Sequence, residues 1–528
     1  MSVHTILMNA LGKELPRSLE IFTPELTLCA TIVALLLLRL VDMQKNGLLA
    51  ALYNAWQVTD GGVGLTGPYF TGLLVHDEFA LFFRLGLSLF LVLVVALTVL
   101  TGIPDQEDGQ DFYTLLFGAT IGMLLATGAN NLLMLFLSVE MMSVPSYAMV
   151  GFLKGKAKSS EAAFKYVVYG AGTAGIMLYG VSLLAGLLGT LDMGQLGERF
   201  ALLMGEQGFG LSAPISVVTV LGILMVLVGL AFKLSLVPFH FWCPDAFEGA
   251  SAEVGGFLSV ASKAAAFALL VRFVMAFQGS AEVLHELSLF FGIALGVCAA
   301  ASMTFGNLAA YTQDNVKRLL AYSTIAHAGY MLMAISALLV ILSNPVSAED
   351  AQYASAALCV EGLMYYIAVY LFMNLAAFAV VALVRNETYR EDIEGFNGLI
   401  SCNTPTKVLC ICMAFSFFSL VGMPPFGGFF AKMLIFYGAF QAGTVHWFLW
   451  ALLAIGGVNT VFSLFYYLRV LKAMFIAPRA EESRPVETPA MVSAYVVLLT
   501  IPLLALGASP LQQDLSATAR YVATVLFQ

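Results

Sequence analysis

The fold is decided by one stretch of the sequence, Gly229-Leu-Ala-Phe-Lys-Leu-Ser-Leu-Val-Pro238-Phe-His-Phe-Trp242. The stretch is apolar enough to lie in a membrane span, yet it holds a lysine followed by a proline. Proline removes a backbone N–H donor and clashes with the preceding turn, so a helix breaks here. In lipid the freed carbonyl groups need partners, and the break is therefore expected to face protein or a water-filled cavity.

A second broken span reads Ser419-Leu-Val-Gly-Met-Pro424-Pro-Phe-Gly-Gly-Phe-Phe-Ala-Lys432. Two interrupted spans in corresponding places indicate a transport site between structural repeats, whereas simple structural kinks are the alternative. Their separation fits two five-helix repeats. We therefore divide the chain into N-terminal helices (1–110), a first repeat (111–277), a second repeat (287–475) and a C-terminal loop with the last helix (476–528).

The composition predicts an all-α polytopic membrane protein. Of the 528 residues, 60% are hydrophobic and only 11% are charged, whereas a soluble domain carries about 25% charged residues. The apolar runs are continuous and long enough to cross a hydrocarbon core of ~30 Å as helices, unlike the short alternating segments of a membrane barrel. Thirteen strong candidate spans lie at residues 21–41, 76–101, 111–128, 130–151, 162–188, 214–240, 255–277, 287–308, 315–342, 360–384, 406–437, 447–475 and 492–508.

Loop charge predicts the orientation of the spans. Basic residues gather in four loops, at 154–158, 317–318, 385–407 and 472–484. Because cytoplasmic loops carry an excess of Lys and Arg, these loops are expected in the cytoplasm, as are Arg39 and Lys45 after the first span. Either residues 47–71 then cross the membrane as a fourteenth span, or the N-terminus lies in the cytoplasm. We favour fourteen spans with both termini outside.

Four charged side chains lie deep in otherwise apolar spans, namely Glu140, Lys233, Lys263 and Lys432. Glu140 is the single glutamate that the sequence places so deep. A charge at mid-bilayer costs from ~2.5 to more than ~10 kcal/mol, so such residues are paired, hydrated or neutral. Snorkelling of the charged end to the interface is the alternative, and it works near helix ends. We predict a functional role for all four residues.

Lysine suits a proton relay because burial can bring the pKa of a lysine near neutrality and a nearby carboxylate moves it back. If Glu140 lies close to Lys233, their separation decides whether the lysine keeps its proton, and the two titrate as one pair. His327, inside a predicted span, could pass protons between the lysines, or it could be a hydrogen-bonded packing residue. Lys165, four residues after Glu161, is either an i,i+4 ion pair or a relay member.

The sequence lacks motifs for binding nucleotides, metals or nucleic acid. No phosphate-binding Gly-rich loop precedes a lysine, and no dinucleotide fingerprint joins a strand to a helix. The seven cysteines are scattered and lack the spacing of metal or iron–sulfur ligands. No basic cluster with interleaved aromatic residues suggests nucleic acid. We therefore expect no cofactor, no metal and no nucleic-acid partner on this chain.

Four stretches carry a resemblance to a known family: Phe232-Lys-Leu-Ser-Leu-Val-Pro-Phe-His-Phe-Trp-Cys-Pro-Asp-Ala-Phe-Glu-Gly-Ala250, Glu161-Ala-Ala-Phe-Lys-Tyr166, Gln313-Asp-Asn-Val-Lys-Arg-Leu-Leu-Ala-Tyr-Ser-Thr-Ile-Ala-His-Ala-Gly-Tyr330 and Gly422-Met-Pro-Pro-Phe-Gly-Gly-Phe-Phe-Ala-Lys432. They resemble the antiporter-like subunits of respiratory complex I, the proton-translocating NADH:quinone oxidoreductase. The resemblance covers about residues 70 to 475. Related Mrp-type sodium/proton antiporter subunits share much of this pattern.

The resemblance implies fourteen helices, two inverted five-helix repeats and a proton channel through the subunit. It assigns Glu140 and Lys233 as an interacting pair, Lys263 as the central relay and Lys432 as the exit-side residue. It implies a translocase subunit of a bacterial cell (inner) membrane that holds no redox centre. NAD(H), FMN, iron–sulfur clusters and quinone would bind to other subunits, and the partners would be other complex I membrane subunits and the lipid bilayer.

Three alternatives remain open from the sequence. The chain could be a subunit of an Mrp-type cation/proton antiporter, or the proton-channel subunit of a membrane-bound hydrogenase. It could also be a scaffold that transports nothing and tolerates the loss of its buried charges.

Overall fold

The computed structural model describes residues 15–38, 47–61, 66–102, 109–205, 208–210, 213–344, 349–479, 488–508 and 510–527. Its elements are α2 (Leu15–Ile21), α3 (Thr23–Leu38), α4 (Gly47–Gly61), β1 (Gly67–Tyr69), β2 (Leu74–His76), α5 (Glu78–Thr101), α6 (Gly109–Thr127), α7 (Leu132–Val150), α8 (Ala157–Leu188), η4 (Met193–Gln195), α9 (Leu196–Met204), α10 (Pro214–Leu234), α11 (Trp242–Gly249), α12 (Ala252–Met275), α13 (Glu282–Ala310), α14 (Val316–Leu342), α15 (Glu349–Thr388), η5 (Ile393–Phe396), η6 (Leu399–Ser401), α16 (Thr404–Val421), α17 (Gly427–Gly443), α18 (Phe448–Phe475), α19 (Ala490–Ala508) and α20 (Pro510–Val525).

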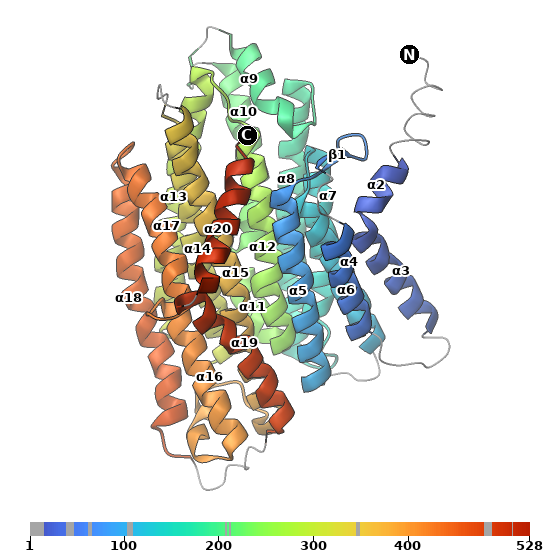
Figure 1. Ribbon diagram of the computed structural model, residues 1–528, viewed down its shortest axis with the longest axis vertical. Helices are drawn as coiled ribbons and strands as arrows, with labels where there is room; N and C mark the ends of the chain where they lie inside the picture. The colour runs from blue at the N-terminus through green and yellow to red at the C-terminus, as the bar shows by residue number, and fades with distance from the viewer. Residues whose placement is uncertain are drawn as a thin grey trace.

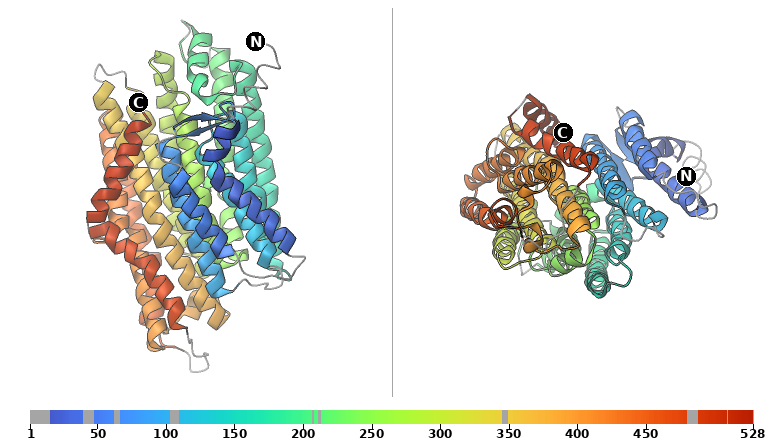
Figure 2. Two further views of the ribbon diagram at one scale, coloured as in Figure 1. Left: turned by 45° about the vertical axis from the view of Figure 1, so that its right-hand side comes forward. Right: turned by 90° about the horizontal axis from the view of Figure 1, so that it is seen from below.

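The long helices run side by side in one bundle, with the N-terminal helices α2 to α4 on one flank (Figures 1 and 2). Several begin at a polar cap, because a side-chain oxygen satisfies one of the free N–H groups of the first turn. Asp77, Asn131, Ser251, Asn315 and Asn403 do this for α5, α7, α12, α14 and α16. The core of the bundle is formed by α12, α14 and α15, whose apolar spans are 100%, 100% and 89% buried.

The prediction of a multi-pass helical membrane protein is confirmed. Eleven helices of the described part are long and apolar enough to cross a membrane. The only described strands are β1 and β2, which pair antiparallel as a short hairpin. Residues 47–71 contain α4, which packs against both α3 and α5, and the start of this hairpin. Fourteen as the number of spans stays a prediction.

The basic loops gather at one end of the bundle, as their charge predicts. Lys158 of the first loop and Arg318 of the second both bind Glu248, with N–O distances of 2.9 and 2.8 Å. Lys317 of the second loop binds Glu391 of the third at 2.9 Å. A backbone hydrogen bond joins the third and fourth loops. Arg39, Lys45 and Arg484 lie outside the described residues.

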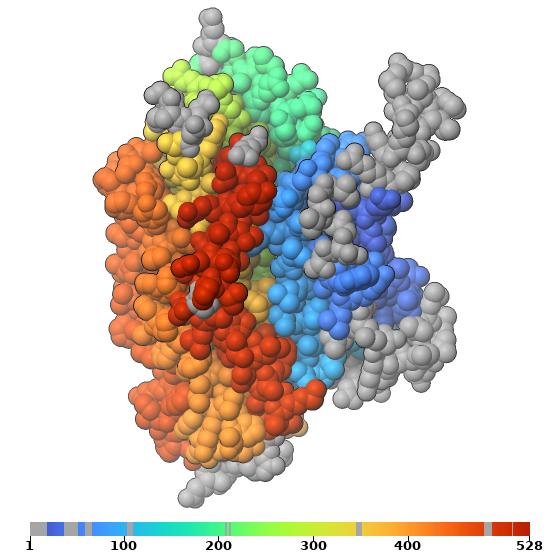
Figure 3. All heavy atoms as spheres, in the orientation of Figure 1, coloured from blue at the N-terminus to red at the C-terminus, as the bar shows by residue number. Residues whose placement is uncertain are grey.

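The start of α2 and the end of α20 both lie toward the opposite end of the bundle, on different flanks (Figures 1 and 2). That both termini lie outside stays a prediction. The last predicted span, 492–508, corresponds to α19, and the amphipathic α20 continues beyond it along α15. Figure 3 shows α19 and α20 crossing the front face of the bundle, between α16 to α18 and α5.

Both predicted breaks are present. One separates α10 from α11 after Leu234, and the other separates α16 from α17 after Val421. In Figure 1, α10 begins near the upper end of the bundle and α16 begins near the lower end. The two broken helices therefore run in opposite directions, which supports the inverted relationship between the repeats.

Candidate functional site: a path of buried charged side chains

Lys233 lies at the end of α10 and is fully buried. Its Nζ atom donates a hydrogen bond of 3.1 Å to Ser143 Oγ on α7. Ser143 follows Glu140 by one helical turn, so both residues lie on one face of α7. Glu140 is half-buried and interacts electrostatically with Lys233, although no direct ion pair joins them in the described part of the chain. Ser143 is thus a hydrogen-bond partner of Lys233 that lies one helical turn from Glu140.

At the first break, the carbonyl groups of Ala231, Phe232 and Leu234 at the end of α10 all accept hydrogen bonds. Ser235 takes a left-handed backbone conformation (φ 59°) and turns the chain out of the helix. Trp242 Nε1 then donates a hydrogen bond of 2.9 Å to the carbonyl oxygen of Phe232. The indole ring stacks on Tyr166 of α8, with ring centroids 4.1 Å apart. These contacts hold the broken helix in one geometry around Lys233.

Lys263 lies in the middle of α12 and is only 1% exposed. Its Nζ atom donates a hydrogen bond of 2.8 Å to the carbonyl oxygen of Leu234. Leu234 is the residue after Lys233 and the last residue of α10. Lys263 therefore caps the first break at the residue that follows Lys233 in the chain. The same Nζ atom lies 3.5 Å from the carbonyl oxygen of Thr324 on α14.

Lys432 has the same relationship to the second break. It is 5% exposed, and its Nζ atom donates a hydrogen bond of 2.8 Å to the carbonyl oxygen of Val421, the last residue of α16. Gly422 follows with φ 87°, a conformation that favours glycine, and a Cβ atom there would lie 2.9 Å from Lys432 Cδ. The ammonium group of Lys432 lies 4.5 Å from the centre of the Tyr330 ring.

His327 lies on α14 between the contacts of these two lysines. Its Nδ1 atom is 2.6 Å from the hydroxyl of Tyr366, and its Nε2 atom is 3.4 Å from the hydroxyl of Tyr467. The imidazole is buried and interacts electrostatically with both Lys263 and Lys432. A histidine held between two hydroxyl groups has a proton donor or acceptor on each nitrogen, as a relay requires.

Helix α14 connects the two halves of the path. Thr324, His327 and Tyr330 are spaced by three residues, so each is a neighbour of the next on the helix surface. Thr324 meets Lys263 at one end of this row, and Tyr330 meets Lys432 at the other. At 1.5 Å per residue the row is about 9 Å long. We call the series Glu140, Ser143, Lys233, Lys263, His327 and Lys432 the buried path.

Lys165 lies outside the buried path. Its Nζ atom binds Glu161 at 2.7 Å, as the i,i+4 spacing predicts, and also Asp245 of α11 at 2.8 Å. Arg318 of α14 binds the other oxygen of Asp245 at 2.6 Å and also Glu248. These ion pairs fasten α11 to α8 and α14. Lys165 therefore has a structural partner set at the basic end of the bundle.

Three buried acids of the described residues were not predicted from the sequence, namely Glu25, Glu253 and Glu361. Glu140 is not the single deep glutamate, because Glu361 on α15 is fully buried while Glu140 is partly exposed. Glu361 Oε2 accepts a hydrogen bond of 2.8 Å from Arg520 of α20. The predicted span began at residue 360, since the residues before it are more polar, whereas α15 begins at Glu349. Glu361 therefore looked like the end of a span.

Comparisons with known proteins point to families of membrane transport subunits. A family of transmembrane proteins described as NADH:quinone oxidoreductase/Mrp antiporter matches residues 129–463. NADH-quinone oxidoreductase subunit N of Anaeromyxobacter sp. (strain Fw109-5) is 40% identical over 495 residues, which cover 89% of this chain and 90% of that protein.

Solved structures show the same architecture. A chain of respiratory complex I from Thermus thermophilus with bound aureothin has a TM-score of 0.71 and 30% identity, covering 94% of this chain and 99% of that one. A chain of the Mrp complex from Dietzia sp. DQ12-45-1b has a TM-score of 0.72, with coverages of 96% and 97%. Because the identity to the Mrp chain is only 20%, this similarity concerns the fold alone.

Two broken helices and a line of buried lysines define an antiporter-like, multi-pass membrane protein. The chain belongs to the NADH:quinone oxidoreductase/Mrp antiporter family, in the branch of NADH-quinone oxidoreductase subunit N. The family resemblance drawn from the sequence is thereby confirmed.

Proposed function

We propose that this chain is a proton-translocating membrane subunit of a bacterial NADH:quinone oxidoreductase and that the buried path carries the proton. The observation that supports this most strongly is the set of buried ionisable residues from Glu140 to Lys432, in which Glu140 interacts electrostatically with Lys233, and His327 with both Lys263 and Lys432. A scaffold without transport would have no need to bury three lysines, each at a high cost in lipid.

In this proposal the Glu140–Lys233 pair is the input of the path. Electron transfer elsewhere in the complex changes the separation of the pair, and the change decides whether Lys233 holds a proton. Lys263 takes the proton next, because it lies beside the end of α10. His327 and its hydroxyl partners then connect Lys263 with Lys432, the exit-side residue.

The proposal places no redox centre on this chain. NAD(H), FMN, iron–sulfur clusters and quinone belong to other subunits, and the chain works beside other membrane subunits of the complex. In the described residues, no group of three or more His, Cys, Asp or Glu side chains is placed to hold a metal ion. The repeat boundaries, 111–277 and 287–475, are part of the same proposal.

The proposal is tested with the whole complex in sealed vesicles, with one dye for pH and one for sodium. NADH and quinone should drive proton movement in sodium-free buffer. Proton movement that requires sodium, or that a sodium gradient drives without NADH, would instead indicate an antiporter subunit. No ion movement at all would support a scaffold.

A further inference from the structure

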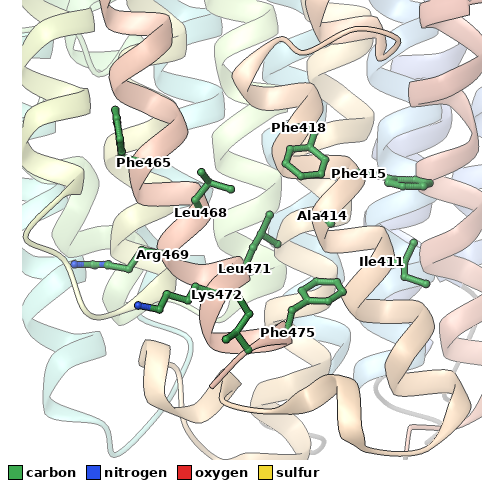
Figure 4. Close-up of a pocket in the computed structure, with 11 residues that line it drawn as sticks. Ile411, Ala414, Phe415, Phe418, Phe465, Leu468, Arg469, Leu471, Lys472 and Phe475 are labelled. Carbon is green, nitrogen blue, oxygen red and sulfur yellow. The ribbon is translucent and has the colours of Figure 1, made fainter. Parts of the chain in front are cut away.

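An open groove lies on the outer surface between α16 and α18, away from the buried path. It encloses about 730 Å³. Phe415 and Phe418 of α16 form one wall, and Phe465 and Leu468 of α18 form the other (Figure 4). Phe465 and Leu468 are 55% and 40% exposed, so the groove presents apolar surface outward.

One edge of this groove is positively charged. Arg469 and Lys472 line the groove and extend from α18 next to each other (Figure 4). Arg469 is anchored by a hydrogen bond of 2.6 Å from its Nη1 atom to the carbonyl oxygen of Tyr311, and its Nη2 atom lies 4.0 Å from the exposed carboxylate of Asp314. Lys472 is exposed, and its ammonium group has neither a hydrogen bond nor an ion pair with any residue that the structure describes.

The dimensions of the groove match one leaflet of a bilayer. It follows α18 from Phe465 to Phe475, which at 1.5 Å per residue is about 15 Å. This length is half of a hydrocarbon core of ~30 Å. Lys472 lies in the last turn of α18, at the end of the bundle where the basic loops gather. Its charge is therefore at the depth of the headgroups of that leaflet.

We propose that this groove binds an anionic phospholipid, with one acyl chain between α16 and α18 and the phosphate on Lys472. Arg469 adds a second positive charge beside the phosphate. The apolar walls match an acyl chain, and the two cations complement an anionic headgroup. The cytoplasmic leaflet, where positive loops are expected, is also the leaflet that attracts basic residues through its anionic lipids.

The test uses the assembled complex, purified and stripped of phospholipid. The probes are photoactivatable phosphatidylglycerol and the matching phosphatidylcholine, each with a diazirine in the acyl chain. Labelled peptides are then mapped by mass spectrometry. We expect phosphatidylglycerol to label the segments around Phe415 and Phe465 at lower concentration than phosphatidylcholine.

Lys472→Gln should raise the half-saturating concentration of phosphatidylglycerol about fivefold, since one basic residue near the surface contributes about 1 kcal/mol. Lys156→Gln, which removes a positive charge from the exposed α7–α8 loop at the same end, should leave it unchanged. Ala414→Phe, which fills the groove without changing charge, should reduce the labelling at saturation.

Three results would overturn the proposal. Equal labelling by the two lipids would mean that the groove holds ordinary annular lipid. An unchanged half-saturating concentration in Lys472→Gln would remove the headgroup site. Cross-links from the groove to another subunit, with no lipid label, would show that a protein covers it.

Discussion

The Nζ atom of Lys263 lies 2.8 Å from the carbonyl oxygen of Leu234, the last residue of α10. Leu234 follows Lys233 directly, so the cap of the broken helix is itself an ionisable member of the buried path. Lys432 and Val421 repeat this relationship at the second break. A movement at either break therefore changes the surroundings of a lysine at once.

Lys263→Gln separates capping from proton transfer. The amide can still donate to the carbonyl of Leu234, but it cannot carry a proton. We expect the complex to assemble and to oxidise NADH, with at least about a tenfold slower movement of protons, which corresponds to 1.4 kcal/mol in the barrier. The measurement is proton uptake or release per NADH in vesicles.

Lys263→Met is the matched variant. It leaves the carbonyl of Leu234 without a partner, which costs about 1–3 kcal/mol, and should also reduce the amount of assembled complex. Normal pumping by Lys263→Gln would exclude Lys263 as a relay residue.

Ser143→Ala removes the hydroxyl that accepts the hydrogen bond of Lys233. One hydrogen bond contributes about 1 kcal/mol, so we expect the proton-pumping rate to fall about fivefold. Ser143→Thr keeps the hydroxyl and should pump normally. Equal rates in the alanine and threonine variants would show that Ser143 does not connect Glu140 with Lys233.

The ring of Tyr330 stabilises the ammonium group of Lys432 through a cation–π contact of 4.5 Å. Such a contact contributes about 2 kcal/mol when it is desolvated. Tyr330→Leu should therefore slow pumping, whereas Tyr330→Phe, which keeps the ring, should retain most of the rate. A similar loss in both variants would assign the effect to the hydroxyl group instead.

The parts of the fold that depend on composition could be predicted from the sequence. Apolar runs predicted the membrane helices. Pro238 and Pro424 predicted both breaks, because a proline lacks the backbone N–H and clashes with the preceding turn of its own helix. The three lysines were found because charge is rare in lipid. Their burial is confirmed, while their roles stay predictions.

The partners of these residues could not be predicted. Ser143, Tyr330, Tyr366 and Tyr467 are ordinary residues of membrane helices, and only the packing of α7, α14, α15 and α18 brings them to the path. Glu361 was missed for a different reason, since the predicted span began at residue 360 and placed Glu361 at its end. Its partner Arg520 lies 159 positions away, on the polar helix α20.

Arg520→Gln should loosen α20 from α15. The substitution leaves the buried carboxylate of Glu361 without its guanidinium partner, and unpaired buried charges are strongly destabilising. We expect faster cleavage of the C-terminal helix in limited proteolysis of the intact complex. Glu361→Gln combined with Arg520→Gln should recover part of the resistance, and a double variant as sensitive as Arg520→Gln alone would show that the pair does not hold α20.

The central claim is that protons pass through the buried lysines, beginning at Lys233. The most direct measurement is the number of protons moved per NADH oxidised by the Lys233→Met complex in sealed vesicles. The control is Lys156→Gln, which loses a lysine outside the buried path. We expect NADH oxidation to continue in both variants and the proton yield to fall only in Lys233→Met. An unchanged proton yield in Lys233→Met would contradict the account.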